Sequence, residues 1–165
     1  MRPLSEEKKP TTVSLNGDTM PNSSRSAWYE KNLDRLKESF HSRCLFKQGG
    51  PVENLRLSFT DSGDLHGTFR CDGRHEGYDG RIHGGILAAI IDASMTQCLM
   101  GHGIAGYTGE LSIRYRDPVA LNSVAEMETR LVNDRFDKFY EIETAVLQEK
   151  KTCVTAKAKF LKVTQ

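Results

Sequence analysis

Residues 80–95, Gly-Arg-Ile-His-Gly-Gly-Ile-Leu-Ala-Ala-Ile-Ile-Asp-Ala-Ser-Met, decide the fold of this chain. The stretch begins as a glycine-rich turn and becomes an apolar run that continues to the break at residues 101–103. Between Gly84 and Met100 the only carboxylate is Asp92, and there is no Lys, Arg or His. Because apolar residues fall on every side of a helix drawn over this segment, we expect a buried core helix. A run of about seventeen residues with an acid mid-way is short for a membrane span.

The start of this predicted helix contains residues that could bind a ligand or take part in catalysis. His83 and two glycines stand where the helix should begin, and the first N–H groups of a helix are unpaired and carry a partial positive charge. Glycines let a ligand oxygen approach that backbone closely. Asp92 needs a partner inside an apolar segment. Two interpretations stay open for it: a structural hydrogen bond to a neighbouring backbone, or a catalytic acid.

Composition excludes several function classes. The chain has 165 residues and a formal net charge of +1, which gives no electrostatic case for a nucleic-acid partner. Four widely spaced cysteines, at positions 44, 71, 98 and 153, without a Cys-x-x-Cys pair, favour reduced thiols in a cytoplasmic protein. His66, Cys71 and His75 match no standard ligand spacing, so we expect no metal or other cofactor. Cys98 lacks a nearby His and is interpreted as core filler rather than a nucleophile.

The rest of the chain divides into three parts. Residues 1–22, rich in Ser, Thr, Pro and charge, are expected to form a disordered or loosely ordered tail. Residues 23–48 show apolar positions at helical spacing and predict an amphipathic helix. Residues 49–165 contain two alternating stretches before the central helix and four after it. Short turns between strands predict an antiparallel sheet whose concave face wraps the apolar helix, an α+β architecture.

The segment from Glu76 to Gly85, with Asp92 nine residues after His83, resembles hotdog-fold acyl-CoA thioesterases of the PaaI-like and THEM-type group. The strand that ends at Asp117-Pro118 also fits, and the resemblance covers roughly residues 54–163. It implies a hotdog fold, here with an additional N-terminal helix. It also implies hydrolysis of an acyl-CoA to a carboxylic acid and free CoA.

The resemblance assigns roles to particular residues. The Gly84 N–H would stabilise the oxyanion, and Asp92 would act as general base or nucleophile. Thr108 matches a position where a Ser or Thr hydroxyl helps to hold the water. His83 either binds the thioester or only caps the helix.

Three further positions follow from the same segment. Gly85 and Tyr78 are candidates for substrate contact. Some relatives carry Asn six residues before the His, and this chain has Gly77 there, which leaves His83 and the backbone to polarise the thioester.

Helix geometry predicts a second copy of the chain. Nine residues separate His83 from Asp92, which is ~13 Å along a helix axis. A single carbonyl cannot contact both the Gly84 N–H and Asp92 of one chain, so Asp92 should come from a partner across a two-fold axis. The resemblance likewise implies a homodimer, or a homotetramer made of two dimers.

Two other functions compete with hydrolysis. One is dehydration or hydration of an acyl thioester, and the other is acyl-CoA binding without turnover. Residues 1–50 offer one helix and no helix-turn-helix, so a transcriptional sensor is disfavoured. The expected partner is acyl-CoA, with no nucleic acid and no membrane. The helix predicted within 23–48 either protects a sheet edge or covers the acyl pocket.

Overall fold

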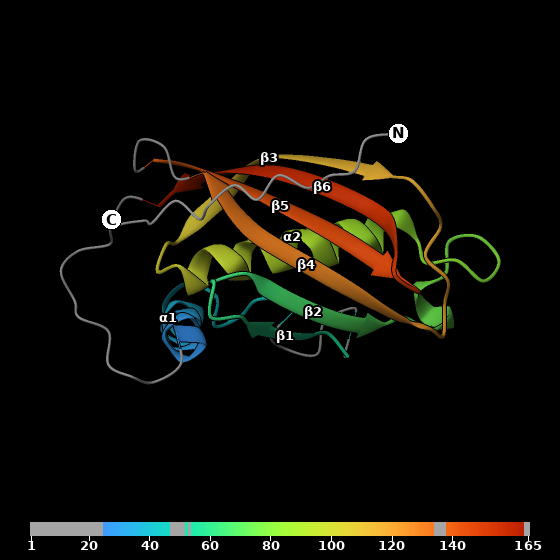
Figure 1. The fold of residues 1–165 in the computed structure, drawn as a ribbon, viewed down its shortest axis with the longest axis horizontal. Helices are drawn as coiled ribbons and strands as arrows, with labels where there is room; N and C mark the ends of the chain where they lie inside the picture. The colour runs from blue at the N-terminus through green and yellow to red at the C-terminus, as the bar shows by residue number, and fades with distance from the viewer. Residues whose placement is uncertain (1–24, 47–51, 53, 134–137, 164–165) are drawn as a thin grey trace.

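A six-stranded antiparallel sheet curves around one long helix (Figure 1). The computed structural model describes residues 25–46, 52, 54–133 and 138–163. The strands run in the spatial order β1-β2-β4-β5-β6-β3; their bounds are β1 Arg56–Phe59, β2 Leu65–Arg70, β3 Gly106–Tyr115, β4 Val124–Asn133, β5 Phe139–Gln148 and β6 Lys151–Lys162. The helices are α1 Arg25–Phe40, the short 3-10 helix η1 Gly73–His75, and α2 Gly84–Gly101. The tail expected over residues 1–22 lies outside the described residues.

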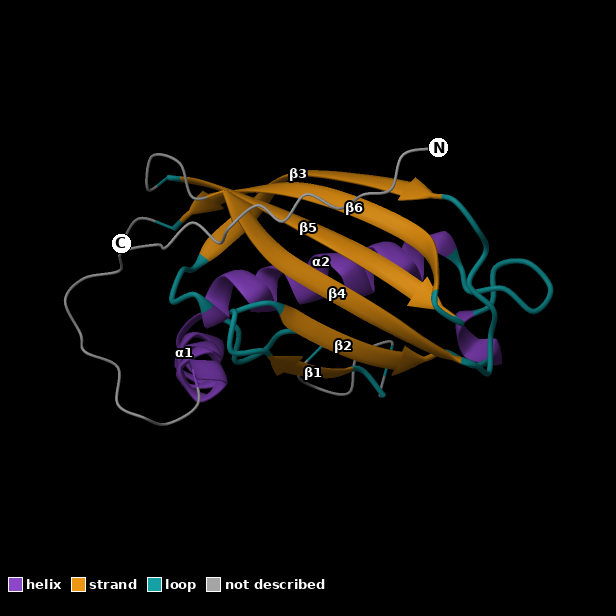
Figure 2. Cartoon of the chain, in the orientation of Figure 1, coloured by secondary structure: helices purple, strands orange, loops and turns teal. Residues whose placement is uncertain are grey.

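The alternation in the sequence produces the two faces of this sheet. In β2, Leu65, Gly67 and Phe69 are buried and alternate with exposed residues, as the period of two along a strand requires. The register between β2 and β4 places Phe69 beside Ala125, so the buried positions of neighbouring strands share one face. That concave face covers α2 (Figure 2). The predicted arrangement, an antiparallel sheet around a long central helix with an additional N-terminal helix, is confirmed.

Helix α2 differs from the expected helix in one respect. Nine of its residues are buried, among them Ile90, Met95 and Leu99, but one stripe of small and polar residues stays half-buried or exposed. Asp92 lies on this stripe, so the expectation of a carboxylate surrounded by apolar side chains is wrong. The sheet curves over only one side of a helix, which leaves the opposite stripe uncovered.

The same helix passes a simple length test for a membrane span. It has 18 residues, and 56% of that span is buried inside the fold. This degree of burial is typical of the core helix of a folded domain, which passes the same test of length and composition.

Helix α1 packs at the end of α2 where the chain leaves it (Figure 1). Leu33 and Leu36 are buried against a cluster that includes Phe59 and Met100. The helix ends at Phe40, eight residues before the end of the range predicted for it, and turns follow over residues 41–46. Phe40, the last residue of the helix, is 41% exposed.

Candidate active site at the start and middle of the core helix

His83 is the N-cap of α2. Its ring atom Nδ1 accepts a hydrogen bond of 2.9 Å from the Gly85 N–H, which satisfies one of the unpaired donors at the helix start. Since Nδ1 is an acceptor, the neutral ring carries its proton on Nε2. The Gly85 N–H is therefore already used within the chain, and the expectation that this amide contacts substrate is not supported by the geometry.

The Gly84 N–H is placed differently. In the part of the chain that the structure describes, this N–H makes no hydrogen bond. The hydroxyl of Tyr115, at the end of β3, donates to the Gly84 carbonyl at 2.8 Å. Burial raises the pKa of Tyr115 above its ordinary value, so the phenol stays a donor. The sequence pattern indicates only that Tyr115 lies in a strand, and no spacing signal links it to Gly84.

The loop before α2 fixes the position of His83. The His83 N–H donates to the His75 carbonyl at 2.8 Å. Asp72 caps η1, and its hydrogen bonds with the side chain and N–H of Arg74 hold the pKa of its carboxyl down at about 2. A Cβ on Gly77 would lie 2.9 Å from the Cα of His83, so a larger side chain there requires the loop to shift.

Asp92 lies two and a half turns further along α2. Its Oδ1 accepts a hydrogen bond of 2.8 Å from the hydroxyl of Thr108 on β3. The sequence had placed both residues in the site, and the structure brings them into contact within one chain. Among the described residues Oδ2 accepts no hydrogen bond, so it can accept one from a water or a substrate atom.

Strand β3 holds the two parts of the site apart. Its first half contacts Asp92 through Thr108, and its end contacts the start of α2 through Tyr115. The strand is the last one of the sheet order, opposite β1, and its residues are exposed or half-buried. One protomer therefore carries two half-sites on one edge, an amide half at Gly84 and a carboxylate half at Asp92.

A cavity of about 120 Å³ opens beside Asp92. It lies between the exposed stripe of α2 and the end of α1 with the turns after it. Its lining residues are Lys37, His41, Cys44, Phe46, Asp92, Ala93, Thr96, Gln97 and Met100. From the sequence, the N-terminal helix could have covered either a sheet edge or an acyl pocket, and its end lies at this cavity.

Comparison with known proteins finds sequences and structures that resemble this chain. Residues 79–133 match the sequence model of the Thioesterase superfamily. Mouse acyl-coenzyme A thioesterase THEM4 is 34% identical over 89 residues, which cover 53% of this chain and 38% of the mouse protein. E. coli PaaI superposes with a TM-score of 0.70 at 15% identity, over 86% of this chain and 97% of PaaI. The chain has the hotdog fold, and its residues 79–133 resemble the thioesterase superfamily.

A third relative is a hypothetical thioesterase from Streptococcus pneumoniae TIGR4, whose structure was solved with coenzyme A. It superposes on the hotdog domain with a TM-score of 0.63 at 21% identity, over 68% of this chain and 91% of that protein. The resemblance to the PaaI-like and THEM-type group is confirmed. The chain spans less than two fifths of the length of the curated relative THEM4.

The other candidates lie away from the site of the hotdog domain. Tyr78 is 87% exposed at the tip of the loop before α2, and the structure brings no other site residue to it. Cys98 is buried, and burial raises the pKa of its thiol to about 12, which argues against a nucleophile. Among the described residues, no group of three His, Cys, Asp or Glu side chains could hold a metal ion.

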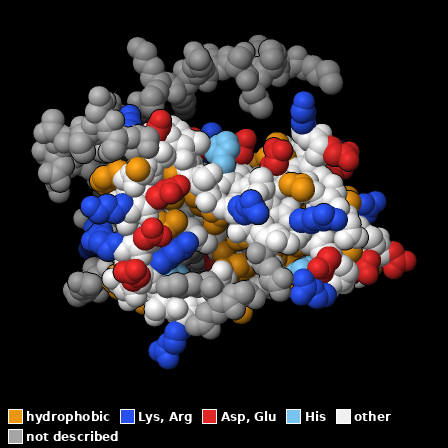
Figure 3. Space-filling view, turned by 90° about the horizontal axis from the view of Figure 1, so that it is seen from below, with side chains coloured by type: hydrophobic (Ala, Val, Ile, Leu, Met, Phe, Trp, Pro, Cys, Tyr) orange, Lys and Arg blue, Asp and Glu red, His pale blue; other side chains and the backbone are white. Residues whose placement is uncertain are grey.

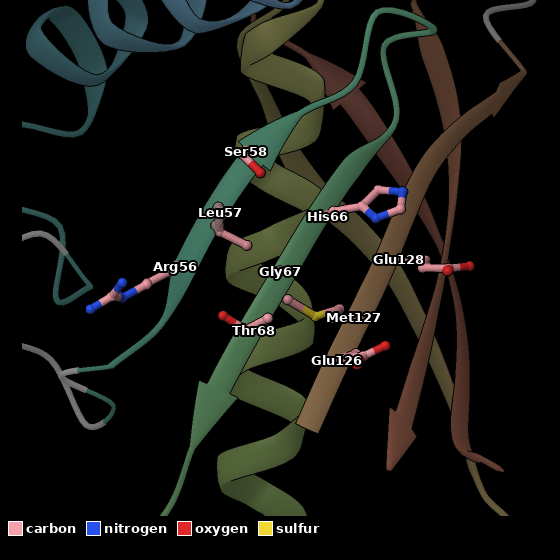
Figure 4. A pocket seen from close by; sticks show the side chains of 9 residues that line it. All are labelled: Arg56, Leu57, Ser58, His66, Gly67, Thr68, Glu126, Met127 and Glu128. Atoms are coloured by element: carbon pink, nitrogen blue, oxygen red, sulfur yellow. The ribbon is translucent and has the colours of Figure 1, made fainter. Parts of the chain in front are cut away.

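His66 lies in a separate hollow of about 220 Å³. Figure 4 shows that the residues around it come from the neighbouring strands β1, β2 and β4. None of the residues expected in the active site lines this hollow. Substitutions in it can therefore serve as controls for substitutions in the candidate active site.

Proposed function

We propose that this chain hydrolyses acyl-CoA thioesters. The observation that carries the proposal is the 2.8 Å contact between the Thr108 hydroxyl and Asp92 on the uncovered stripe of α2. The contact orients a carboxylate where a water and a substrate can reach it. The names of the relatives support the same chemistry, since THEM4 is an acyl-coenzyme A thioesterase and the streptococcal protein was solved with coenzyme A.

The streptococcal protein offers a further parallel. Structures were solved for alanine variants of one Asp and one Thr, whose separation along that chain equals the separation of Asp92 and Thr108. The pairing of these two residue types at this spacing supports a shared role in the site.

The reaction follows from the two half-sites. Asp92 takes a proton from water while the water oxygen bonds to the thioester carbon. The carbonyl oxygen gains negative charge and accepts hydrogen bonds from the Gly84 N–H and from Nε2–H of His83. The carbonyl then re-forms as the C–S bond breaks, and the CoA sulfur takes the proton from Asp92. In the alternative route Asp92 attacks the carbon directly, the C–S bond breaks, and CoA leaves as the thiolate. Water then opens the resulting anhydride and supplies the proton that the thiolate takes.

A homodimer completes the site. Edge strand β3 offers its free backbone groups to a second β3, and an antiparallel pair would place the Thr108 end of one strand opposite the Tyr115 end of the other. The Asp92 of one protomer then meets the Gly84 N–H of its partner. Two such dimers would form a tetramer. All four cysteines are free thiols, which favours a reducing compartment, and we assign the reaction to the cytoplasm.

The direct test measures CoA release from a panel of acyl-CoA esters. Asp92→Asn keeps the size of the side chain and removes the base, so kcat should fall by about 10²–10⁴-fold. Glu128→Gln makes the same chemical change on the outer face of the sheet (Figure 4) and should leave kcat unchanged. Single turnover in oxygen-18 water detects the anhydride route when water attacks the Asp92 carbonyl, because only that attack puts the label into Asp92.

Other outcomes would overturn the proposal. Binding of acyl-CoA by the parent chain without CoA release would indicate a binding protein. Loss or gain of water from the acyl group with the thioester intact, seen by mass spectrometry, would indicate a dehydratase or hydratase. Equal turnover by Asp92→Asn and the parent would remove Asp92 from the mechanism.

A further inference from the structure

The cavity beside Asp92 indicates which acyl groups the site accepts. This inference rests on the proposed hydrolysis. Asp92 forms part of the cavity wall. A thioester whose carbonyl carbon lies near Asp92 has its acyl chain on one side and its CoA on the other. The cavity is a partly open space beside Asp92 between α2 and the end of α1 with the turns after it, so it is suited to the acyl side.

The size of the cavity limits that acyl group. Its volume is about 120 Å³, whereas an engineered protein cavity that binds benzene measures ~150 Å³. By this comparison the space is somewhat smaller than a benzene-sized cavity. That is enough for the chain of a butyryl or hydroxybutyryl group beyond its carbonyl, and too little for a phenyl ring or a ten-carbon chain.

The chemistry of the walls adds a second constraint. Phe46, Ala93 and Met100 supply apolar surface, while His41, Thr96 and Gln97 supply hydrogen-bonding groups. A purely alkyl chain would cover these polar groups without pairing them, which is unfavourable. A site built to hydrogen-bond a substrate hydroxyl discriminates strongly against the analogue that lacks it.

His41 is held in this wall by its backbone. Its N–H donates to the Lys37 carbonyl at 3.0 Å, and its carbonyl accepts from the Cys44 N–H at 3.1 Å. Burial and the nearby Lys37 lower the pKa of His41, against the opposing effect of Asp92. A neutral imidazole offers one donor and one acceptor, which suits a hydroxyl group.

We propose that the turn after α1 forms the acyl subsite with the exposed stripe of α2, and that His41 and Thr96 select short acyl groups bearing a hydroxyl. His41 and Thr96 are specificity residues in this assignment. The Asp92 half-site performs the chemistry, and the cavity decides which acyl chain reaches it.

The test compares kcat/KM for 3-hydroxybutyryl-CoA, butyryl-CoA, phenylacetyl-CoA and decanoyl-CoA. The parent chain should favour the hydroxybutyryl ester over the butyryl ester by at least about fivefold, the effect of one net hydrogen bond. It should turn over the two larger esters more slowly than butyryl-CoA. His41→Leu and Thr96→Val should each bring the hydroxybutyryl-to-butyryl ratio close to one.

Matched controls come from the outer face of the sheet. His66→Leu and Thr68→Val make the same changes in the hollow of Figure 4 and should preserve the ratio. Thermal unfolding shows whether each variant folds, and the two cavity variants test the inference independently.

The outcomes separate this inference from the proposed function. Preferred hydrolysis of decanoyl-CoA or phenylacetyl-CoA would overturn the inference and leave thioester hydrolysis in place. A hydroxybutyryl preference that both cavity variants retain would also overturn it. Release of CoA from none of the esters would overturn the proposed function and the inference with it.

Discussion

At the scale of single residues, the Gly84 N–H can be removed without a change of fold. Proline is tolerated at the first position of a helix, and the extended backbone of His83, with φ −62° and ψ 131°, is what a residue before proline prefers. A Cβ on Gly84 would meet the Tyr115 ring at 3.6 Å, an ordinary contact. We predict that Gly84→Pro folds but lowers kcat by about 10²–10³-fold, the loss of one oxyanion donor.

Steady-state kinetics and circular dichroism check this prediction. Gly84→Ala adds a side chain but keeps the N–H, so it should lose far less activity than Gly84→Pro. Equal losses in the two variants would show that bulk at this position, not the donor, affects turnover.

Substitutions of His83 can separate its role as the helix N-cap from its role as a hydrogen-bond donor to the thioester oxygen. Asn is a good N-cap and can replace Nδ1 as the acceptor for the Gly85 N–H, but it does not supply the Nε2–H of the ring. We predict that His83→Asn keeps the melting temperature within a few degrees, whereas His83→Ala lowers stability by about 1 kcal/mol. Both should lower kcat. Full activity in His83→Asn would mean that the imidazole acts only as a cap.

Sequence reasoning located these residues but not their partners. The His-Gly-Gly start and Asp92 are visible because the glycines and the lone acid interrupt an apolar pattern. The capture of the Gly85 N–H by His83 and the contact of Tyr115 with Gly84 depend on side-chain rotamers and on strand placement. Hydrophobic periodicity does not contain that information.

At the scale of elements, the end of α2 is fixed by close packing. A Cβ on Gly101 would overlap the ring of Phe59 on β1. Replacing Gly by Ala within a helix gains ~1 kcal/mol in propensity, and overpacking a core costs ~1–3 kcal/mol. We predict that Gly101→Ala is destabilising overall, measured by chemical denaturation. A smaller residue at Phe59 should relieve the overlap, and a more stable Gly101→Ala variant would contradict this packing.

The order and type of the elements could be predicted, because strand alternation and helical spacing act locally. The uncovered stripe of α2 could not be predicted from the helix sequence. Small residues such as Ala93 fit a core as well as a surface that a second chain covers. The end of α1 at Phe40 was also missed, since the apolar spacing continues past the last helical residue.

At the scale of the whole molecule, we propose that two chains bring the two half-sites together. Figure 3 shows apolar surface among charged side chains on one face of a single chain. We predict a dimer or a tetramer in solution, measured by light scattering coupled to size exclusion. Replacing Ile113 in the middle of β3 by Pro removes a backbone donor on the side of the strand that faces away from β6, so it should weaken assembly and lower kcat together. A fully active monomer would contradict the shared site.

The most direct test of the shared site is complementation between two inactive variants. Asp92→Asn and Gly84→Pro are mixed in equal amounts, dissociated and reassembled. Random pairing makes half of the dimers mixed, and each mixed dimer has one intact site, so about one quarter of the parent activity should return. If Asp92 and Gly84 act within one chain, every site contains one of the two substitutions and no activity returns.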